Sequence, residues 1–322
     1  MKETIRMYKE NEELTLRQAF DKFICEKKAL QVAPDTIRSY TRVFKSFTDF
    51  SPDNSLCSEI SSATIFQFVE FVQARNPHIK TVTINMYLRH MRGFFYHCMN
   101  AGYVKRFDIK MLRYEKEIKE TYSAFELEQL LKKPNVKKCS FAQYRNWVLV
   151  CYLLGTGNRL GTVCNLQIKD IDFANHEIVL RKVKNKKQYI IPLAPTLEKT
   201  LAEYLQYRKG DGDDYLFCTP HGEKMKKDTL TSAISRYNLS HGVTKTSIHL
   251  FRHTFAKNWI LNGGDIFRLK SILGHSSLEI VKEYVNMFGG DLQKDFDKFN
   301  PLEQMKATVA GREGIKMTKR AN

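Results

Sequence analysis

The chain has 322 residues, with 52 lysines and arginines against 35 acidic residues and a formal net charge of +17. This length favours more than one domain, and the positive charge favours a polyanionic partner, nucleic acid first among them. The longest uninterrupted apolar run, 147–154, is much shorter than the roughly 20 residues of a membrane-spanning helix. Because the charged first residues also lack the apolar core of a secretory signal, we expect a cytoplasmic protein without a membrane span.

The first hundred residues predict a wholly helical domain. Apolar residues recur there at helical spacing, and no alternating strand pattern interrupts them. The expected helices cover residues 16–33, 34–50, 62–75 and 80–101. We place the domain at 12–103, and the charged, poorly patterned segment 104–120 predicts an interdomain linker.

Two of these helices have a polar face opposite an apolar stripe. The polar face of the second helix holds Arg38, Arg42 and Lys45. The polar face of the fourth holds Asn85, Arg89, Arg92 and Tyr96. Residues three or four apart share a helix face, so the two faces together are candidate DNA-binding surfaces. For either helix alone, an ordinary solvated surface is the better interpretation.

A second, mixed domain is expected at 121–300. Ser123 and Glu126 have the spacing of a capping box at the start of a helix. Further helices are expected at 144–155, 197–208, 227–237 and onward from 249. Alternating apolar residues between 166 and 193 predict a small antiparallel sheet. The expected fold class is therefore mainly α with a small antiparallel β-sheet.

The segment from His249 to Tyr284 contains side chains suited to phosphoryl transfer. It places His249, Arg252, His275 and Tyr284 in order along the chain. Attack on a phosphodiester requires fixed cationic donors for the phosphate oxygens, a nucleophile, and an acid for the leaving oxygen. Each residue taken singly is better explained by packing, a turn or a salt bridge. Their combination favours a catalytic site.

The motifs HLFRHTFA and LGHSS, with Tyr284 nine residues after His275, resemble the C-terminal signature of the tyrosine recombinase (phage integrase) family. The family's other arginine and its hairpin lysine have counterparts in Arg159 of GTGNR and Lys184 of RKVKNKKQYIIPL. For Lys184, a solvated lysine-rich turn is the alternative. Many family members carry an acidic residue where this chain has Thr162, which leaves room for slower or more tightly regulated catalysis.

The resemblance covers nearly the whole chain and implies the simple two-domain layout of Xer-type and transposon integrases. The helical SAM-like domain would bind the core DNA, and the mixed α/β domain would be catalytic. The Tyr284 hydroxyl would attack a DNA phosphate, leaving a 3'-phosphotyrosyl link and a free 5'-hydroxyl. Because that link conserves the bond energy, exchange through a Holliday junction would need neither ATP nor a metal.

The resemblance also implies the remaining roles in the site. Arg159 and Arg252 would clamp the phosphate oxygens, since guanidinium donors bind them bidentately. Lys184 would protonate the departing oxygen. His249 would help to move the proton from Tyr284, and His275 would donate a hydrogen bond to the phosphate.

No cofactor is expected. The seven cysteines are scattered without a CxxC motif, which fits neither a disulfide framework nor a zinc site. The implied partners are double-stranded DNA with paired recognition sites, three further copies of the chain in a tetramer on that DNA, and an accessory DNA-bending or directionality factor. The tail at 301–322 is expected either to exchange between protomers or to pack on its own domain.

Two other functions stay open at this point. A topoisomerase-like enzyme would use the same phosphotyrosine chemistry to nick and close DNA without exchanging strands. A DNA-binding accessory protein would keep the fold without activity, although the complete set of site residues disfavours it. Tyr237 and Tyr215 are weaker candidates for the nucleophile.

Overall fold

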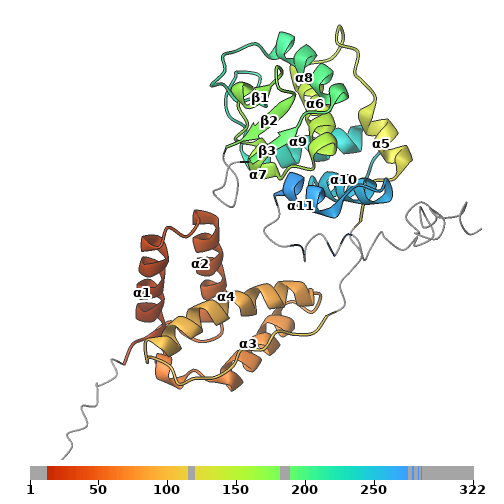
Figure 1. Ribbon diagram of the computed structural model, residues 1–322. Helices are drawn as coiled ribbons and strands as arrows, with labels where there is room; N and C mark the ends of the chain where they lie inside the picture. Colours follow the sequence, from red (N-terminus) through yellow and green to blue (C-terminus); the bar gives the residue numbers. More distant parts are fainter. Residues whose placement is uncertain are drawn as a thin grey trace, which may run out of the picture. The chain divides into compact units, whose positions relative to one another are not determined.

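The computed structural model describes residues 13–114, 120–181 and 189–274, together with Leu278, Lys282 and Tyr284. The chain divides into two compact units, residues 1–117 and 118–322, each with its own hydrophobic core (Figure 1). Lys184, His275 and the tail at 301–322 lie outside the described residues.

The first unit is helical, as predicted. It contains α1 (Leu16–Ala29), α2 (Pro34–Thr48), α3 (Ser62–Arg75), α4 (Thr81–Asn100) and the short 3-10 helix η1 (Cys57–Glu59). A capping box between Thr15 and Gln18 starts α1. The helices α1, α2 and α4 pack against one another. In the core between them, Phe20 stacks on Phe44 with ring centroids 3.8 Å apart, and Phe94 meets both rings edge-on.

The segment after α4 belongs to the first unit, although its charged composition predicted a linker from residue 104. Val104 and Ile109 are buried in the core of this unit. Farther along, both backbone polar groups of Leu112 bond to the Asn85 side chain at 2.8 Å. Isolated apolar residues among charges give no helical or strand periodicity, so the sequence did not reveal that this segment packs.

The second unit combines helices with a small sheet, which confirms the predicted fold class. It contains the helices α5 (Ala124–Leu131), α6 (Phe141–Thr156), α7 (Leu160–Val163), η2 (Ile168–Asp170), α8 (Pro195–Arg208), α9 (Lys227–Ser240), α10 (His249–Leu261) and α11 (Ile266–Leu273). Its strands are β1 (Ile171–Asp172), β2 (Glu177–Leu180) and β3 (Tyr189–Pro192). They pair antiparallel in the order β1-β2-β3, and Val179 lies opposite Ile190.

The helix α6 is the centre of this unit. It contacts α5, α8, α9 and α10, and Val148, Leu149 and Val150 are all fully buried (Figure 1). A helix with apolar residues on every face must be covered on every side, which explains why the other helices surround it. Within the described parts of the chain, no helix is both long and apolar enough to cross a membrane.

Candidate active site

Two arginines from distant parts of the second unit converge on the C-terminal end of α11. The Arg252 guanidinium donates to the backbone oxygens of Gly157 and Leu273, both at 2.9 Å. The Arg159 guanidinium donates to the oxygens of Leu273 and Gly274, both at 3.3 Å. Carbonyls at the C-terminal end of a helix carry partial negative charge, so they fix both cations. The Leu273 oxygen accepts from both arginines.

The turn after α6 positions Arg159. The helix is capped by Gly157, which adopts a left-handed conformation with φ +61°. The following residue, Asn158, is buried, and its amide donates to the Tyr152 hydroxyl at 2.8 Å. Arg159 then stands at the N-terminal end of α7. The left-handed conformation of Gly157 therefore turns the chain so that Arg159 and the Gly157 oxygen both lie beside Arg252.

Positive charge is concentrated where Arg159 and Arg252 meet at the end of α11. Burial, then repulsion from Arg159, lowers the pKa of Arg252 to about 10, while Tyr284 and Tyr189 act in the opposite direction. Arg252 is only 6% exposed, yet with this pKa it remains protonated at neutral pH. Desolvation and the positive charges of Arg252 and Arg159 also lower the pKa of His249. Two neighbouring guanidiniums would be stabilised by a bound anion such as a phosphate.

The Tyr284 hydroxyl lies next to these cations. Tyr284 is helical and 2% exposed, and its hydroxyl interacts with the Arg252 side chain by a hydrogen bond that raises the pKa of Arg252. The Nδ1 atom of His253 is 2.8 Å from the Tyr284 hydroxyl oxygen. The ring packs in an apolar cluster with Ala256, Leu269 and Leu273. Packing by α10 and α11 therefore places a phenol beside the arginine pair.

The predicted basic face of α2 is present, but its charges differ in their surroundings. Arg38, Arg42 and Lys45 are all exposed. Arg38 forms an ion pair with Asp35 one turn earlier on the same helix. Part of the charge of Arg38 is therefore already balanced within the protein.

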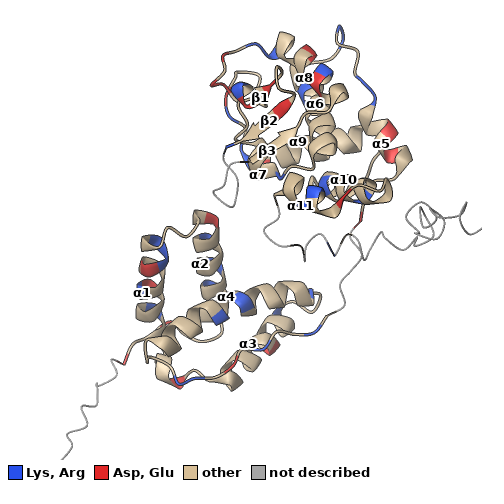
Figure 2. Ribbon diagram, viewed as in Figure 1, with Lys and Arg blue, Asp and Glu red and all other residues tan. Residues whose placement is uncertain are grey.

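The predicted polar face of α4 needs one correction. Asn85 is 3% exposed, and its amide is engaged with the backbone of Leu112, so it does not belong to the solvent-facing row. Arg89 and Arg92 are exposed on α4, where Figure 2 shows positive charge. Helical spacing alone could not separate Asn85 from them, because Asn85 lies four residues before Arg89 at the edge of the apolar stripe.

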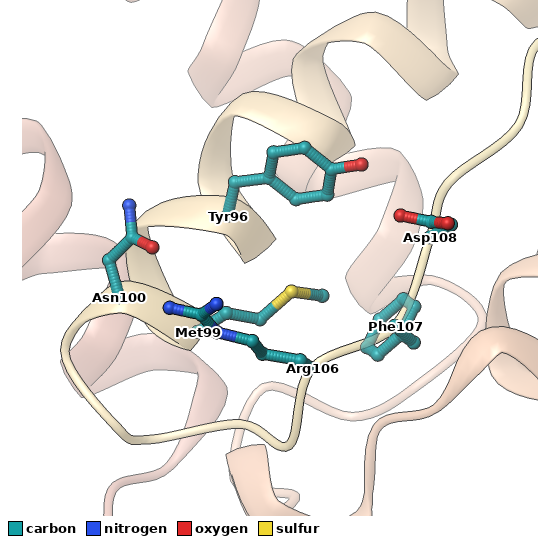
Figure 3. A pocket seen from close by; sticks show the side chains of 6 residues that line it. All are labelled: Tyr96, Met99, Asn100, Arg106, Phe107 and Asp108. Carbon is teal, nitrogen blue, oxygen red and sulfur yellow. The ribbon is translucent and has the colours of Figure 1, made fainter.

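The α4 face continues from Arg92 to Tyr96 and Asn100 and ends at an open pocket of about 400 Å³ (Figure 3). The pocket is lined by Tyr96, Met99, Asn100, Arg106, Phe107 and Asp108. An exposed aromatic ring, an amide and a further arginine thus extend the row of arginines on this helix.

Two models of known protein families match the two units of the chain. Residues 120–289 match the model of the phage integrase family, and residues 15–116 match that of the phage integrase SAM-like domain. The chain belongs to the phage integrase family, the tyrosine recombinases. The tyrosine recombinase XerD of Staphylococcus epidermidis is 24% identical to it over 301 residues, which cover 89% of this chain and 99% of that protein.

Two solved structures share the fold of this tyrosine recombinase. The Tn1549 transposon integrase, in complex with a circular intermediate DNA, matches with a TM-score of 0.70 at 19% identity and covers 89% of this chain and 100% of its own. A lambda integrase tetramer bound to a Holliday junction matches with a TM-score of 0.67 at 16% identity, covering 84% of this chain and 80% of its own.

In this tyrosine recombinase the structure brings Arg159, Arg252 and Tyr284 together, and His249 stands one helical turn before His253 on α10. Thr162, at the position that is often acidic in the family, is buried in α7. The predicted site residues Lys184 and His275 lie outside the described part of the chain.

Sequence reasoning missed two residues at this site. His253 contacts the Tyr284 hydroxyl, and Tyr189 at the start of β3 raises the pKa of Arg252. The signal for His253 was its place four residues after His249, which puts both imidazoles on one face of α10. Tyr189 could have been found from its position directly after the lysine-rich hairpin.

Proposed function

We propose that this protein is a site-specific DNA recombinase or integrase that cleaves DNA with Tyr284 and rejoins it to a partner duplex. The observation that carries the proposal is the Tyr284 hydroxyl beside the paired arginines. The hydroxyls of Tyr284 and Tyr189 favour the charged form of Arg252. An anion-binding site with a nucleophile at its edge suits attack on a phosphodiester.

The cleavage step follows from these positions. The Tyr284 oxygen attacks the scissile phosphorus and forms a 3'-phosphotyrosyl bond, while the bond to the 5'-oxygen breaks. Arg159 and Arg252 stabilise the charge that develops on the phosphate oxygens. We assign protonation of the departing 5'-oxygen to Lys184 and a hydrogen bond to the phosphate to His275, on the family resemblance of their motifs.

Strand exchange reverses this chemistry on a second duplex. A free 5'-hydroxyl from the partner DNA attacks the phosphotyrosyl link, and two such exchanges pass through a Holliday junction. The phosphotyrosine conserves the energy of the broken bond, so we propose a reaction that uses neither ATP nor a metal. The lambda integrase tetramer on a Holliday junction supports a tetramer as the active assembly. The Tn1549 integrase supports a role in a mobile element, and an accessory DNA-bending or directionality factor remains part of the proposal.

Exposed basic residues of the SAM-like domain are the proposed contacts to the DNA backbone. On α4 these are Arg89 and Arg92, and on α2 they are Arg42 and Lys45, with Arg38 contributing less because of its ion pair with Asp35. Asn85 is not proposed as a DNA contact, because its side chain is buried against Leu112.

The first test replaces Tyr284 with phenylalanine. Nicked duplexes that tile the DNA flanking the gene should trap the wild-type protein covalently, because the nicked strand diffuses away and cannot be rejoined. Tyr284→Phe should give no covalent adduct in denaturing gels and should retain its DNA affinity in gel-shift measurements. Tyr237→Phe, in which another buried hydroxyl is removed, is the matched control and should still form the adduct. An adduct from Tyr284→Phe would place the nucleophile elsewhere.

A second test separates recombination from topoisomerase-like nicking and closing. Two intact copies of the mapped site should yield Holliday junctions and exchanged products with the wild-type protein. Relaxation of supercoiled DNA without any junction would overturn the recombinase assignment and favour the topoisomerase-like alternative.

A further inference from the structure

The Tyr284 hydroxyl has an imidazole partner that the family motif did not assign. Nδ1 of His253 is 2.8 Å from the hydroxyl oxygen, and the two ring centroids are 5.6 Å apart. His253 is partly buried on α10, directly after Arg252, whose guanidinium also interacts with Tyr284. One turn of α10 therefore contributes a cation and an imidazole to the same phenol.

His249 is placed differently. It is the first residue of α10, and its pKa is lowered by desolvation and then by the charges of Arg252 and Arg159. The two arginines thus act on His249, whereas Nδ1 of His253 is within hydrogen-bond distance of the nucleophile.

We propose that His253 is the catalytic base that accepts the proton of Tyr284 during DNA cleavage. This inference rests on the proposed function. As the Tyr284 oxygen forms its bond to phosphorus, the O–H bond breaks and the proton passes to the lone pair of His253 Nδ1. The bond from phosphorus to the 5'-oxygen breaks, and that oxygen takes a proton from the general acid, to which Lys184 is assigned. On religation the His253 imidazolium returns its proton to the departing tyrosine oxygen.

A neighbouring imidazole can activate a tyrosine hydroxyl as a nucleophile. A tyrosine hydroxyl ordinarily has a pKa of about 10 and is a weak nucleophile near neutrality. A neutral imidazole with its proton on Nε2 presents a lone pair on Nδ1, which can accept the hydroxyl proton. The positive charge of Arg252 beside the same oxygen stabilises the negative charge that develops on it. The geometry meets the distance requirement for a general base.

One test of this role needs no DNA. Long-range proton–nitrogen NMR correlations of the full-length protein should show neutral His253 with its proton on Nε2 and Nδ1 as the acceptor. Tyr284→Phe removes the hydroxyl and should shift the His253 Nδ1 resonance more than that of any other histidine. A His253 that carries its proton on Nδ1, or a resonance that Tyr284→Phe leaves unmoved, would overturn the proposal.

The kinetic test uses the nicked duplex that traps the wild-type protein. His253→Gln and His253→Ala should slow adduct formation by roughly 100-fold or more, the usual contribution of a general base. A sulfur in place of the bridging 5'-oxygen makes a leaving group that needs no proton. This substrate should restore the rate of Lys184→Ala but not that of the His253 variants, because the base acts on the attacking oxygen.

The pH dependence of cleavage gives a readout that a structural role would not change. Among the residues that the structure describes, the charged and titratable groups that act on Tyr284 and Arg252 or on each other here are Arg252 and His249 on α10, Arg159 before α7 and Tyr189 on β3. Of these His249 is the one other imidazole, and desolvation and the charges of Arg252 and Arg159 lower its pKa. The wild-type rate should rise with pH as His253 loses its proton, and His249→Gln should keep this rise, whereas His253→Gln should lose it.

The control is His241→Gln, which also removes an imidazole whose Nδ1 is hydrogen-bonded, in this case to the Tyr237 backbone oxygen at 2.8 Å. It should cleave at the wild-type rate. The His253 variants must keep the wild-type circular dichroism and DNA affinity, so that a slow rate reports chemistry. A wild-type rate and pH profile in both His253 variants would overturn only the role of His253. Absence of any wild-type adduct would overturn the recombinase proposal itself.

Discussion

At the scale of single residues, the glycine at the end of α6 determines where the paired arginines lie. The Gly157 oxygen accepts from Arg252, and its φ of +61° directs the chain back toward α10. A Cβ at this position would lie 2.7 Å from Leu273 Cδ2 and 2.8 Å from Phe255 Cδ1. The site therefore requires a residue without a side chain here, both for its backbone conformation and for space.

Gly157→Ala should consequently destabilise the second unit and impair the site. The left-handed conformation and the crowded contacts together should cost roughly 2–4 kcal/mol of unfolding free energy. Chemical denaturation measures this loss, and adduct formation should fall with it because the carbonyl that holds Arg252 moves. The control is Gly222→Ala, where φ is +84° and nothing lies within 4 Å of the added Cβ. It should lose only about 1 kcal/mol, the conformational cost alone. Equal losses in the two variants would show that crowding at Gly157 contributes nothing.

At the scale of elements, one side chain of α4 fastens the segment that follows the helix. Asn85 donates to the Leu112 oxygen and accepts from its N–H, both at 2.8 Å. The contact joins residues 27 positions apart. It holds the end of the first unit against the same helix that presents Arg89 and Arg92. The polar residue that the sequence suggested for DNA contact instead has a structural role.

Asn85→Ala should therefore destabilise the first unit by about 1–3 kcal/mol, because it leaves two backbone groups of Leu112 without their partners. Chemical denaturation measures the change in stability. Hydrogen exchange of the α4 and Leu112 amides tests whether the loss comes from this contact. The matched control on the same helix is Asn100→Ala, an exposed amide whose loss should change stability by no more than about 0.5 kcal/mol. Unchanged protection of the Leu112 amide in Asn85→Ala would contradict the role assigned to this contact.

At the scale of the whole molecule, the net charge of +17 predicts that DNA binding depends strongly on salt. Each phosphate contact releases condensed counterions, so the logarithm of the affinity falls linearly with that of the salt concentration. The charge alone does not show which residues bind. The exposed positions of Arg89 and Arg92 on α4 make them suitable for a direct test.

The double variant Arg89→Ala and Arg92→Ala should reduce the slope of this salt dependence by roughly 2, since each phosphate contact contributes about 0.9. Fluorescence anisotropy with a labelled duplex at several salt concentrations provides the measurement. Arg75→Ala is the control, because it removes an exposed arginine that is already paired with Asp49 at 2.6 Å. Its slope should match that of the wild type. A double variant with an unchanged slope would remove the α4 face from the DNA contacts.

The sequence by itself determined the helices of the first unit, the small sheet and the family. Helices such as α2 and α4 follow from a local repeat of apolar residues, and the sheet from local alternation. The motifs around Arg159, Arg252 and Tyr284 identified the family because they combine specific residue types at fixed spacing. None of these inferences required knowledge of which segments pack together.

Only the tertiary structure decided which partners these residues have. His249 and His253 lie on the same face of α10, so helical spacing could not tell which imidazole meets Tyr284. The packing of the tyrosine against α10 and α11 selects His253. Likewise, Asn85 and Arg89 share a face of α4 by spacing. The segment around Leu112 packs against α4 and buries Asn85, whereas Arg89 stays exposed. Such choices depend on contacts between residues far apart in the chain, which periodicity does not record.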